Sequence, residues 1–306
     1  MSKSVNVLTD LKNVLIITTG FPPMNNISAR RFGGMVQYME EFGWRPWVVT
    51  LESQGSLPVD IPESQVVRIG RANQVGDKVA EPDSQPMSLY LSFLRKIVRK
   101  SGCRLYSVDT TLFVWYRQVI NRSHIVDSLG KFDLVLASFG PPAALWLGRY
   151  FSSRYNVPWI ADFRDLGAIR DDSRPRVIRL VDMFIENYLL DTAVGITTVG
   201  NELARMLKNV YHKPTKAIFN GYWFCDQHAS ERVSPREMYS TRFVYYAGQF
   251  YDHRLNALEI VFNAIRRFPG LSLMIRSAGP SHMERKVVER VKRLGVADQV
   301  KILPAC

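Results

Sequence analysis

Three charged side chains stand at the end of a short apolar run near the middle of the sequence. The run Pro158–Asp162 leads directly into Asp162, Arg164 and Asp165. Charged groups at the end of a buried strand are poor candidates for the core. One alternative is that they pair with one another as a structural cluster. The other is that they orient a hydroxylated substrate, with a carboxylate that accepts hydrogen bonds from sugar hydroxyls and with Arg164 facing a phosphate.

A loop near the N-terminus offers a candidate site for an anion. Gly20 follows the apolar run Asn13–Thr19, and Asn26 and Ser28 lie just before a predicted helix. Free backbone N–H groups and the helix dipole favour an anion such as phosphate at this position. Ser28 is predicted to be the N-cap of the helix. The alternative is an ordinary strand-to-helix turn with no ligand, since neither GxGxxG nor GxxxxGK[ST] is present.

A third loop has the same character. Gly140 lies between the apolar run Asp133–Ser138 and a helical pattern that begins at Ala143. The carboxyl ends of parallel strands meet at one rim of a sheet. We therefore expect the loops at 20–28, 138–142 and 162–165 to converge there.

A similar loop occurs nearer the C-terminus. Gly248 follows the apolar run Phe243–Ala247 and precedes a helical pattern. Gly248 would allow close approach of the backbone to a ligand, and Arg254 could meet a diphosphate. An ordinary turn with solvated charges fits equally well.

Metal ligation and nucleophilic catalysis find no support among the sequence motifs. The three cysteines lie far apart, the five histidines form no HExxH spacing, and no GxSxG is present. We expect no dedicated metal site and no cofactor. The cysteine usage indicates a reducing compartment.

The elements that must position these residues form an alternating pattern. Apolar runs without polar alternation are typical of parallel strands buried on both faces, and intervening amphipathic segments predict helices. The predicted strands are Asn13–Thr19, Pro46–Leu51, Val66–Ile69, Asp133–Ser138, Pro158–Asp162, Ala193–Val199, Thr215–Phe219, Phe243–Ala247, Ser272–Ser277 and Gln299–Leu303. The predicted helices are Ala29–Phe42, Leu112–Leu129, Ala143–Tyr155, Pro175–Leu190, Asn201–Tyr211, Leu255–Phe268 and Ser281–Leu294.

The polar stretch 226–242 divides the chain. It carries no sustained apolar period, so we expect a first domain over 1–225, a linker over 226–242 and a second domain over 243–306. Two and a half strand–helix units are too few for a doubly wound domain. Either the second domain is cut short, which we favour, or its strands extend another sheet.

The positive charge is concentrated in one segment. The 306 residues carry a formal net charge of +12, and residues 89–124 hold seven basic residues against one acid. Arg95, Lys96, Arg99 and Lys100 flank an apolar stripe in this segment. A helix of this kind could bind an anionic membrane, or it could be an ordinary surface helix whose stripe packs on the core.

Composition and targeting signals exclude several classes. With 46% hydrophobic and 22% charged residues the chain is neither disordered nor fibrous. No apolar run reaches the about 18–20 residues of a membrane span, and no secretory signal is present. The expected location is cytoplasmic, with a peripheral contact at the inner face of the membrane. No recognised motif supports a nucleic-acid partner.

Several segments, taken in order, resemble family 4 (group 1) glycosyltransferases, which have the GT-B fold. The resemblance covers about residues 13–303. The matching segments are NVLIITTGFPPMNNISARR from 13, FDLVLASFGPPAALWLG from 132, NVPWIADFRDL from 156, GITTVGNELARML from 195, AIFNGYW from 217 and YYAGQFYDHRLNALEIVFNAI from 245.

The resemblance implies a complete Rossmann-like acceptor domain followed by part of a nucleotide-sugar donor domain. The donor phosphates would lie near Gly20, Asn26 and Ser28 in the first domain and near Gly248 and Arg254 in the second. The remaining positions would line the cleft. Asp162, Arg164 and Asp165 would lie on its acceptor side near the reacting carbon, and Gly140, Asn220 and Gly221 at the cleft and interdomain crossover.

The implied activity is transfer of a sugar from a nucleotide-sugar donor to a lipid-linked or polysaccharide acceptor. The family acts with retention, usually without metal, and this would serve cell-surface glycan biosynthesis. The sequence departs from the family at Leu166-Gly167 and Gln249, and the family's E-x7-E pair would lie beyond Cys306. Whether the chain is itself an enzyme is therefore open. The alternative is a non-catalytic half-enzyme or partner subunit.

Overall fold

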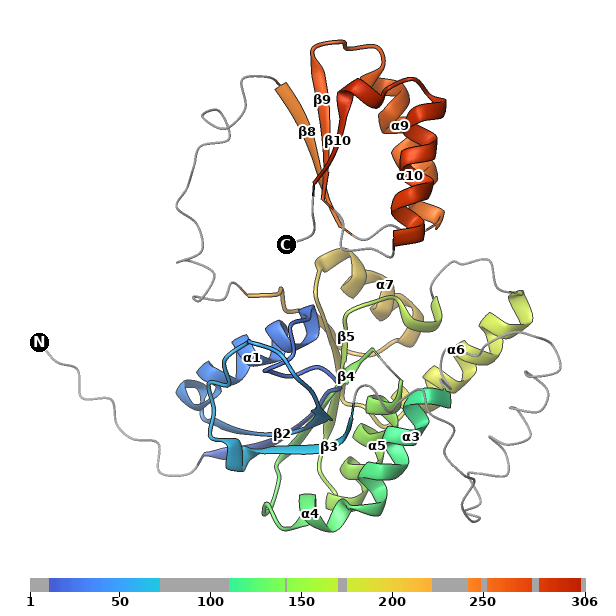
Figure 1. The fold of residues 1–306 in the computed structure, drawn as a ribbon. Helices are drawn as coiled ribbons and strands as arrows, with labels where there is room; N and C mark the ends of the chain where they lie inside the picture. Colours follow the sequence, from blue (N-terminus) through green and yellow to red (C-terminus); the bar gives the residue numbers. More distant parts are fainter. Residues whose placement is uncertain are drawn as a thin grey trace, which may run out of the picture. The chain divides into compact units, whose positions relative to one another are not determined.

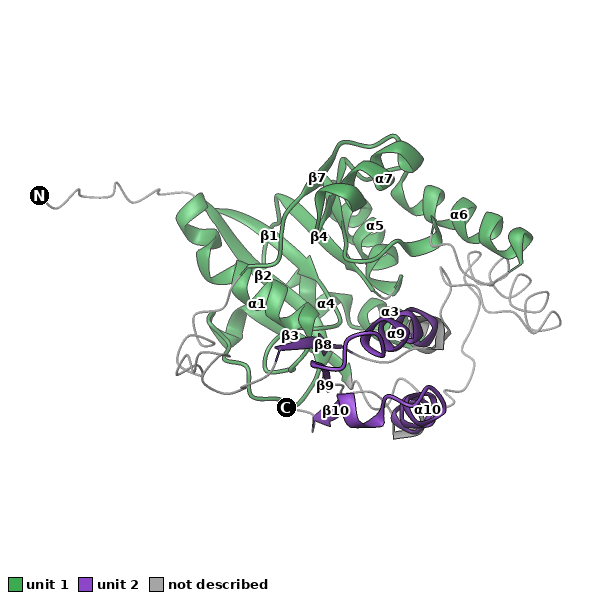
Figure 2. Cartoon of the chain, turned by 90° about the horizontal axis from the view of Figure 1, so that it is seen from above, with its two compact units in different colours: residues 1–224 green, residues 225–306 purple. Residues whose placement is uncertain are grey.

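The computed structural model contains two compact units, Met1–Phe224 and Cys225–Cys306 (Figure 2). We call them unit 1 and unit 2. The residues that the structure describes are 11–71, 110–140, 142–169, 175–221, 242–248, 252–276 and 281–303. Residues 226–241 of the expected linker lie outside these ranges, as do Arg95, Lys96, Arg99 and Lys100.

Unit 1 is built on a seven-stranded parallel sheet (Figure 1). Its strand order is β3-β2-β1-β4-β5-β6-β7. The central strands are apolar on both faces, and the last four residues of β1 are all buried. The strands are β1 (Lys12–Ile17), β2 (Trp44–Glu52), β3 (Val66–Arg71), β4 (Leu134–Phe139), β5 (Trp159–Phe163), β6 (Gly195–Thr198) and β7 (Thr215–Ala217).

Helices cover both faces of this sheet. Phe32 and Val36 of α1 pack with Val14 and Ile16 of β1 in one apolar cluster. A larger cluster on the other face gathers side chains from α3, α5, α6 and α7. The helices are α1 (Ile27–Met39), α3 (Thr110–Asn121), α4 (Ser123–Asp127), α5 (Ala143–Tyr155), α6 (Arg176–Leu190) and α7 (Asn201–Tyr211).

The single helix expected over Leu112–Leu129 is wrong, because it breaks into α3 and α4. Arg122 has φ −113° and ψ 19°, outside the helical range. The neighbours Asn121 and Ser123 have weak helix propensity. The break allows Val126 of α4 to join the larger apolar cluster.

Unit 2 is a smaller structure of the same kind. Its three strands are parallel in the order β10-β9-β8 and form a sheet of their own, so the alternative that they extend another sheet is wrong. Helices α9 and α10 pack on one face of that sheet around Phe262, Leu273 and Val287. The elements are β8 (Arg242–Ala247), α9 (Asp252–Ile265), β9 (Leu271–Arg276), α10 (Ser281–Arg293) and β10 (Val300–Leu303). The expected α/β fold class is confirmed.

Candidate functional site

The strand order of unit 1 identifies where a ligand would bind. The order reverses between β1 and β4, so the loops that follow these strands lead to helices on opposite faces. In open α/β sheets, ligands bind in the crevice at the carboxyl ends of the strands at such a switch point. The candidate residues of unit 1 follow β1, β4, β5 and β7, at this edge of the sheet.

The loop after β1 is held tightly against the start of α1. Asn26 is the N-cap, and its side-chain Oδ1 accepts a hydrogen bond from Ala29 N at 2.8 Å. The prediction of Ser28 as N-cap is therefore wrong. The helix begins at Ile27, and the buried Ser28 hydroxyl lies 3.3 Å from that of Thr18. A Cβ on Gly20 would lie 2.6 Å from Ser28 Cβ, so this close approach requires glycine.

A buried ion pair lies beneath this edge of the sheet. Arg31 of α1 and Asp162 at the end of β5 are 3% and 2% exposed. Arg31 Nη2 donates to Asp162 Oδ1 at 2.7 Å, and Arg31 Nε donates to Asp162 Oδ2 at 3.1 Å. This two-point geometry fixes the planes of both side chains.

Strand register brings two hydroxyls to the same carboxylate. Ser138 of β4 and Thr197 of β6 are the register partners of Asp162 on its two sides. The Thr197 hydroxyl donates to Asp162 Oδ1 at 2.8 Å, and the Ser138 hydroxyl lies 3.5 Å from Oδ2. Both oxygens of Asp162 are thus occupied by neighbours within unit 1. The exposed Asp165 is the carboxylate of this loop that faces solvent.

The remaining Arg31 nitrogen holds the segment after β7. Its Nη1 donates to the carbonyl oxygen of Ile218 at 2.7 Å and to Oδ1 of Asn220 at 3.0 Å. Arg31 therefore joins α1, β5 and the segment that contains Asn220, while Gly221 is exposed with open space around it. The sequence reasoning missed Arg31. The sequence does contain a signal for Arg31, because its helical spacing places it on the same face of α1 as Ser28 and Phe32. The structure shows that this face is buried.

Arg164 bridges the loops after β4 and β5. Its Nη2 donates to the carbonyl oxygen of Gly140 at 3.0 Å and lies 3.4 Å from that of Phe139. Gly140 has φ +116°, and a Cβ there would lie 2.6 Å from Arg164 Nη2. The structure thus brings together Gly140 and Arg164, which the sequence placed in separate loops.

A second buried carboxylate supports the loop that follows Asp165. Glu186 of α6 accepts hydrogen bonds from the backbone N–H of Ala168 at 2.8 Å and from the hydroxyl of Tyr211. Burial, and then the neighbouring Glu186 carboxylate, raise the pKa of Tyr211 above its ordinary value. The sequence reasoning did not identify Glu186 or Tyr211.

In unit 2, Gly248 follows β8 with φ +155°, and its N–H donates to the carbonyl oxygen of Arg276 at 3.1 Å. Arg254 lies in the first turn of α9, where the side chains are outside the described part of the structure. Among the described residues no group of three or more His, Cys, Asp or Glu side chains could hold a metal ion. No helix in the described ranges is long and apolar enough to cross a membrane.

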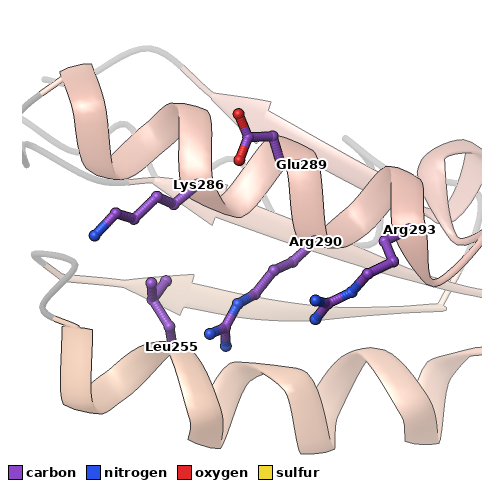
Figure 3. Close-up of a pocket in the computed structure, with 5 residues that line it drawn as sticks. All are labelled: Leu255, Lys286, Glu289, Arg290 and Arg293. Carbon is purple, nitrogen blue, oxygen red and sulfur yellow. The ribbon is translucent and has the colours of Figure 1, made fainter.

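Unit 2 also has a shallow basic groove between α9 and α10 (Figure 3). Its volume is about 380 Å³, and Arg290 and Arg293 lie within it at 3.0 and 3.2 Å from Glu259 carboxylate oxygens. Glu259 therefore neutralises part of the positive charge of this groove. Its lining residues are Leu255, Lys286, Glu289, Arg290 and Arg293.

Solved structures of other proteins share the architecture of this chain. No protein-family model and no curated protein sequence matches the chain. Sucrose-phosphate synthase from Thermosynechococcus elongatus is similar in structure, with TM-score 0.60 and 17% identity over 96% of this chain and 71% of its own. HepE from Anabaena, solved with UDP and glucose, has TM-score 0.53 and 12% identity over 96% and 70%. A glycosyltransferase from Rickettsia africae has TM-score 0.53 and 12% identity over 97% and 69%.

These solved structures are GT-B glycosyltransferases, and each is matched over almost the whole of this chain. The parallel sheets of both units agree with that architecture. The chain therefore has the α/β fold of the GT-B glycosyltransferases.

Proposed function

We propose that this protein is a glycosyltransferase of family 4 that takes a sugar from a nucleotide-sugar donor. The observation that carries the proposal is the GT-B fold, shared with HepE, whose solved complexes contain UDP and UDP-glucose. The polar loops that cluster at the switch point of unit 1 support a ligand site at the carboxyl ends of its strands.

The loops of unit 1 suit recognition of a hydroxylated acceptor. Asp165 is an exposed carboxylate that can accept hydrogen bonds from sugar hydroxyls, and it follows directly on Arg164. Asp162 is an internal anchor rather than a group that faces solvent, because Arg31 and Thr197 occupy its oxygens. In this proposal Asp162 positions the loop that carries Arg164 and Asp165.

Donor chemistry requires stabilisation of the negative charge that develops on the leaving diphosphate. Helix N-termini and basic side chains provide this without a metal. We assign this role to the start of α1, capped by Asn26, and to Gly248 and Arg254 in unit 2. Transfer with retention is part of the proposal and rests on the resemblance to family 4.

The proposed acceptor is lipid-linked or a growing polysaccharide, and the proposed role is cell-surface glycan biosynthesis at the inner face of the membrane. The net charge of +12 supports an anionic acceptor or membrane. The segment that carries Arg95, Lys96, Arg99 and Lys100 would contribute to that contact.

A second candidate is a non-catalytic half-enzyme or partner subunit. The two candidates differ in whether this chain alone transfers sugar or needs a second polypeptide that supplies further donor contacts.

Calorimetric titration with UDP and UDP-glucose, followed by a transfer assay with lipid extract as acceptor, tests the proposal. We expect saturable binding of UDP, weakened by Gly248→Val because valine does not tolerate φ +155°. Gly270→Val, at a glycine with open space around it, is the control. Binding without transfer would favour the half-enzyme. Absence of binding for UDP and for a panel of other nucleotide sugars would exclude the first candidate.

A further inference from the structure

Helix α6 turns a row of large apolar side chains toward solvent. Four of its residues, spaced three or four apart, are 43–69% exposed. This spacing places them on one face of the helix. They are Val177, Leu180, Phe184 and Tyr188, and we call them the α6 stripe. In Figures 1 and 2, α6 projects at the periphery of unit 1.

The orientation of α6 is fixed by its opposite face. Asp182 and Glu186, four residues apart, are 0% and 1% exposed, so the two acids of the helix point inward. Glu186 accepts hydrogen bonds from the backbone N–H of Ala168 and from the Tyr211 hydroxyl. A rotation that buried the α6 stripe would break these bonds. The outward direction of the stripe is therefore built into the fold.

Two arginines flank the α6 stripe. Arg176 is exposed at the start of the helix, and the guanidinium of Arg149 lies 4.3 Å from the centre of the Tyr188 ring. Because both acids of α6 are buried, the helix presents no carboxylate to solvent. The exposed Asp191 follows its last residue, and the preceding sequence at 170–174, RDDSR, has two bases and two acids.

Aliphatic and aromatic side chains in a line, flanked by arginines, are typical of helices that lie in a membrane interface. Arginine stems can extend along apolar surface while the guanidinium reaches lipid phosphate. With 15 residues, α6 is too short to span a bilayer but long enough to lie along its surface. A protein partner would be expected to provide carboxylates for the arginines as well as an apolar groove.

We propose that the α6 stripe docks unit 1 on an anionic lipid surface. This inference deepens the proposed function by naming the surface that would bring the protein to a lipid-linked acceptor. The basis is the outward stripe, its fixed orientation and the complementary charge of its surroundings. Docking requires no sugar donor, so it can be measured independently of transfer.

Flotation of the full chain with vesicles tests the proposal. The vesicles are phosphatidylcholine alone or with about one-third phosphatidylglycerol. We expect binding to the anionic vesicles, and a decrease of at least about fivefold in the bound fraction for Leu180→Ser/Phe184→Ser. Arg176→Gln should weaken binding to the anionic vesicles and leave binding to the phosphatidylcholine vesicles unchanged. The matched control is Phe42→Ser/Ile260→Ser, because Phe42 and Ile260 are 76% and 72% exposed on other elements.

Four results would overturn the proposal. They are no vesicle binding by the wild-type chain, equal binding by the stripe and control variants, a fall in Tm for the stripe variant alone, and conversion of an oligomer to a monomer by that variant. The third would show that another part of the chain covers the α6 stripe, and the fourth that a second copy does. The titration with UDP is a separate measurement that does not depend on vesicle binding. Failure of docking can therefore be distinguished from failure of the proposed function.

Discussion

Gly140 and Arg164 form the contact that joins two loops of the candidate site. The carbonyl oxygen of Gly140 accepts from Arg164 Nη2 at 3.0 Å, and the glycine has no side chain to displace that guanidinium. The position therefore matters both for the backbone, at φ +116°, and for the space that Arg164 occupies. Gly130 has nearly the same φ, +117°, but no atom lies within 4 Å of an added Cβ there.

Gly140→Ala and Gly130→Ala separate these two effects. Each should lose about 1–3 kcal/mol of unfolding free energy through backbone strain. Only Gly140→Ala should displace Arg164, and we expect it to lower the rate of sugar transfer by about ten- to a hundredfold. Urea unfolding and initial rates check the two parts. Equal rates for the two variants would contradict a role for Arg164 in the site.

At the scale of elements, Glu186 and Tyr211 tie α6 and α7 to the loop after β5. Tyr211 is 5% exposed and its hydroxyl donates to the Glu186 carboxylate. Ionisation of that phenol would remove the donor and place a second negative charge beside Glu186. Burial of the phenol, and then the neighbouring Glu186 carboxylate, raise the pKa of Tyr211 above its ordinary value of 10.0.

The raised pKa predicts how stability depends on pH. Tyr211 titrates in the unfolded chain near pH 10 but stays protonated in the folded chain, so its contribution is complete below that pH. Above it, the free energy of unfolding should fall by about 1.4 kcal/mol per pH unit on account of this group. Tyr211→Phe should remove that part of the slope in urea unfolding between pH 9 and 11. Tyr38→Phe, at a more exposed site, should retain it.

Most elements were predictable from the sequence because buried parallel strands are continuous apolar runs. The run from Asn13 marked β1 and the run from Asp133 marked β4 to within one or two residues. The split of α3 from α4 was not predictable, because the apolar period continues through Arg122. The N-cap was misplaced by two residues because Asn26 and Ser28 are both good caps.

The candidate site was predictable only in part. The convergence of loops followed from the parallel sheet, and it placed Gly140, Asp162 and Arg164 at one edge. The buried partners Arg31 and Glu186 were missed because each lies on a helix outside the loop it holds, 131 residues from Asp162 and 18 residues from Ala168 respectively. Their pairing depends on which helix faces cover the sheet, and that depends on the tertiary structure.

At the scale of the whole molecule, each unit has its own apolar clusters. No cluster among the described residues mixes side chains of the two units. Units with separate cores can unfold separately. A substitution in the core of unit 1 should therefore leave unit 2 unaffected.

Arg31→Met is the substitution for this test. It leaves Asp162 buried without its cation and should cost about 3–5 kcal/mol. Calorimetry should show two transitions, with only that of unit 1 lowered. Arg205→Met, which removes a largely exposed pair with Glu202, should change unit 1 by less than about 1 kcal/mol. A shift of both transitions by Arg31→Met would contradict independent unfolding.

The pairing of Arg31 with Asp162 also constrains which substitutions these two positions can accept during evolution. A single mutation at either position leaves a buried charge uncompensated, so a lineage that loses one partner would be under selection to restore it or to replace the other. The two residues lie 131 positions apart in the sequence, yet we expect substitutions at one to be accompanied by substitutions at the other. Relatives that retain this packing are expected to carry both residues together with a hydrogen-bonding residue at position 197.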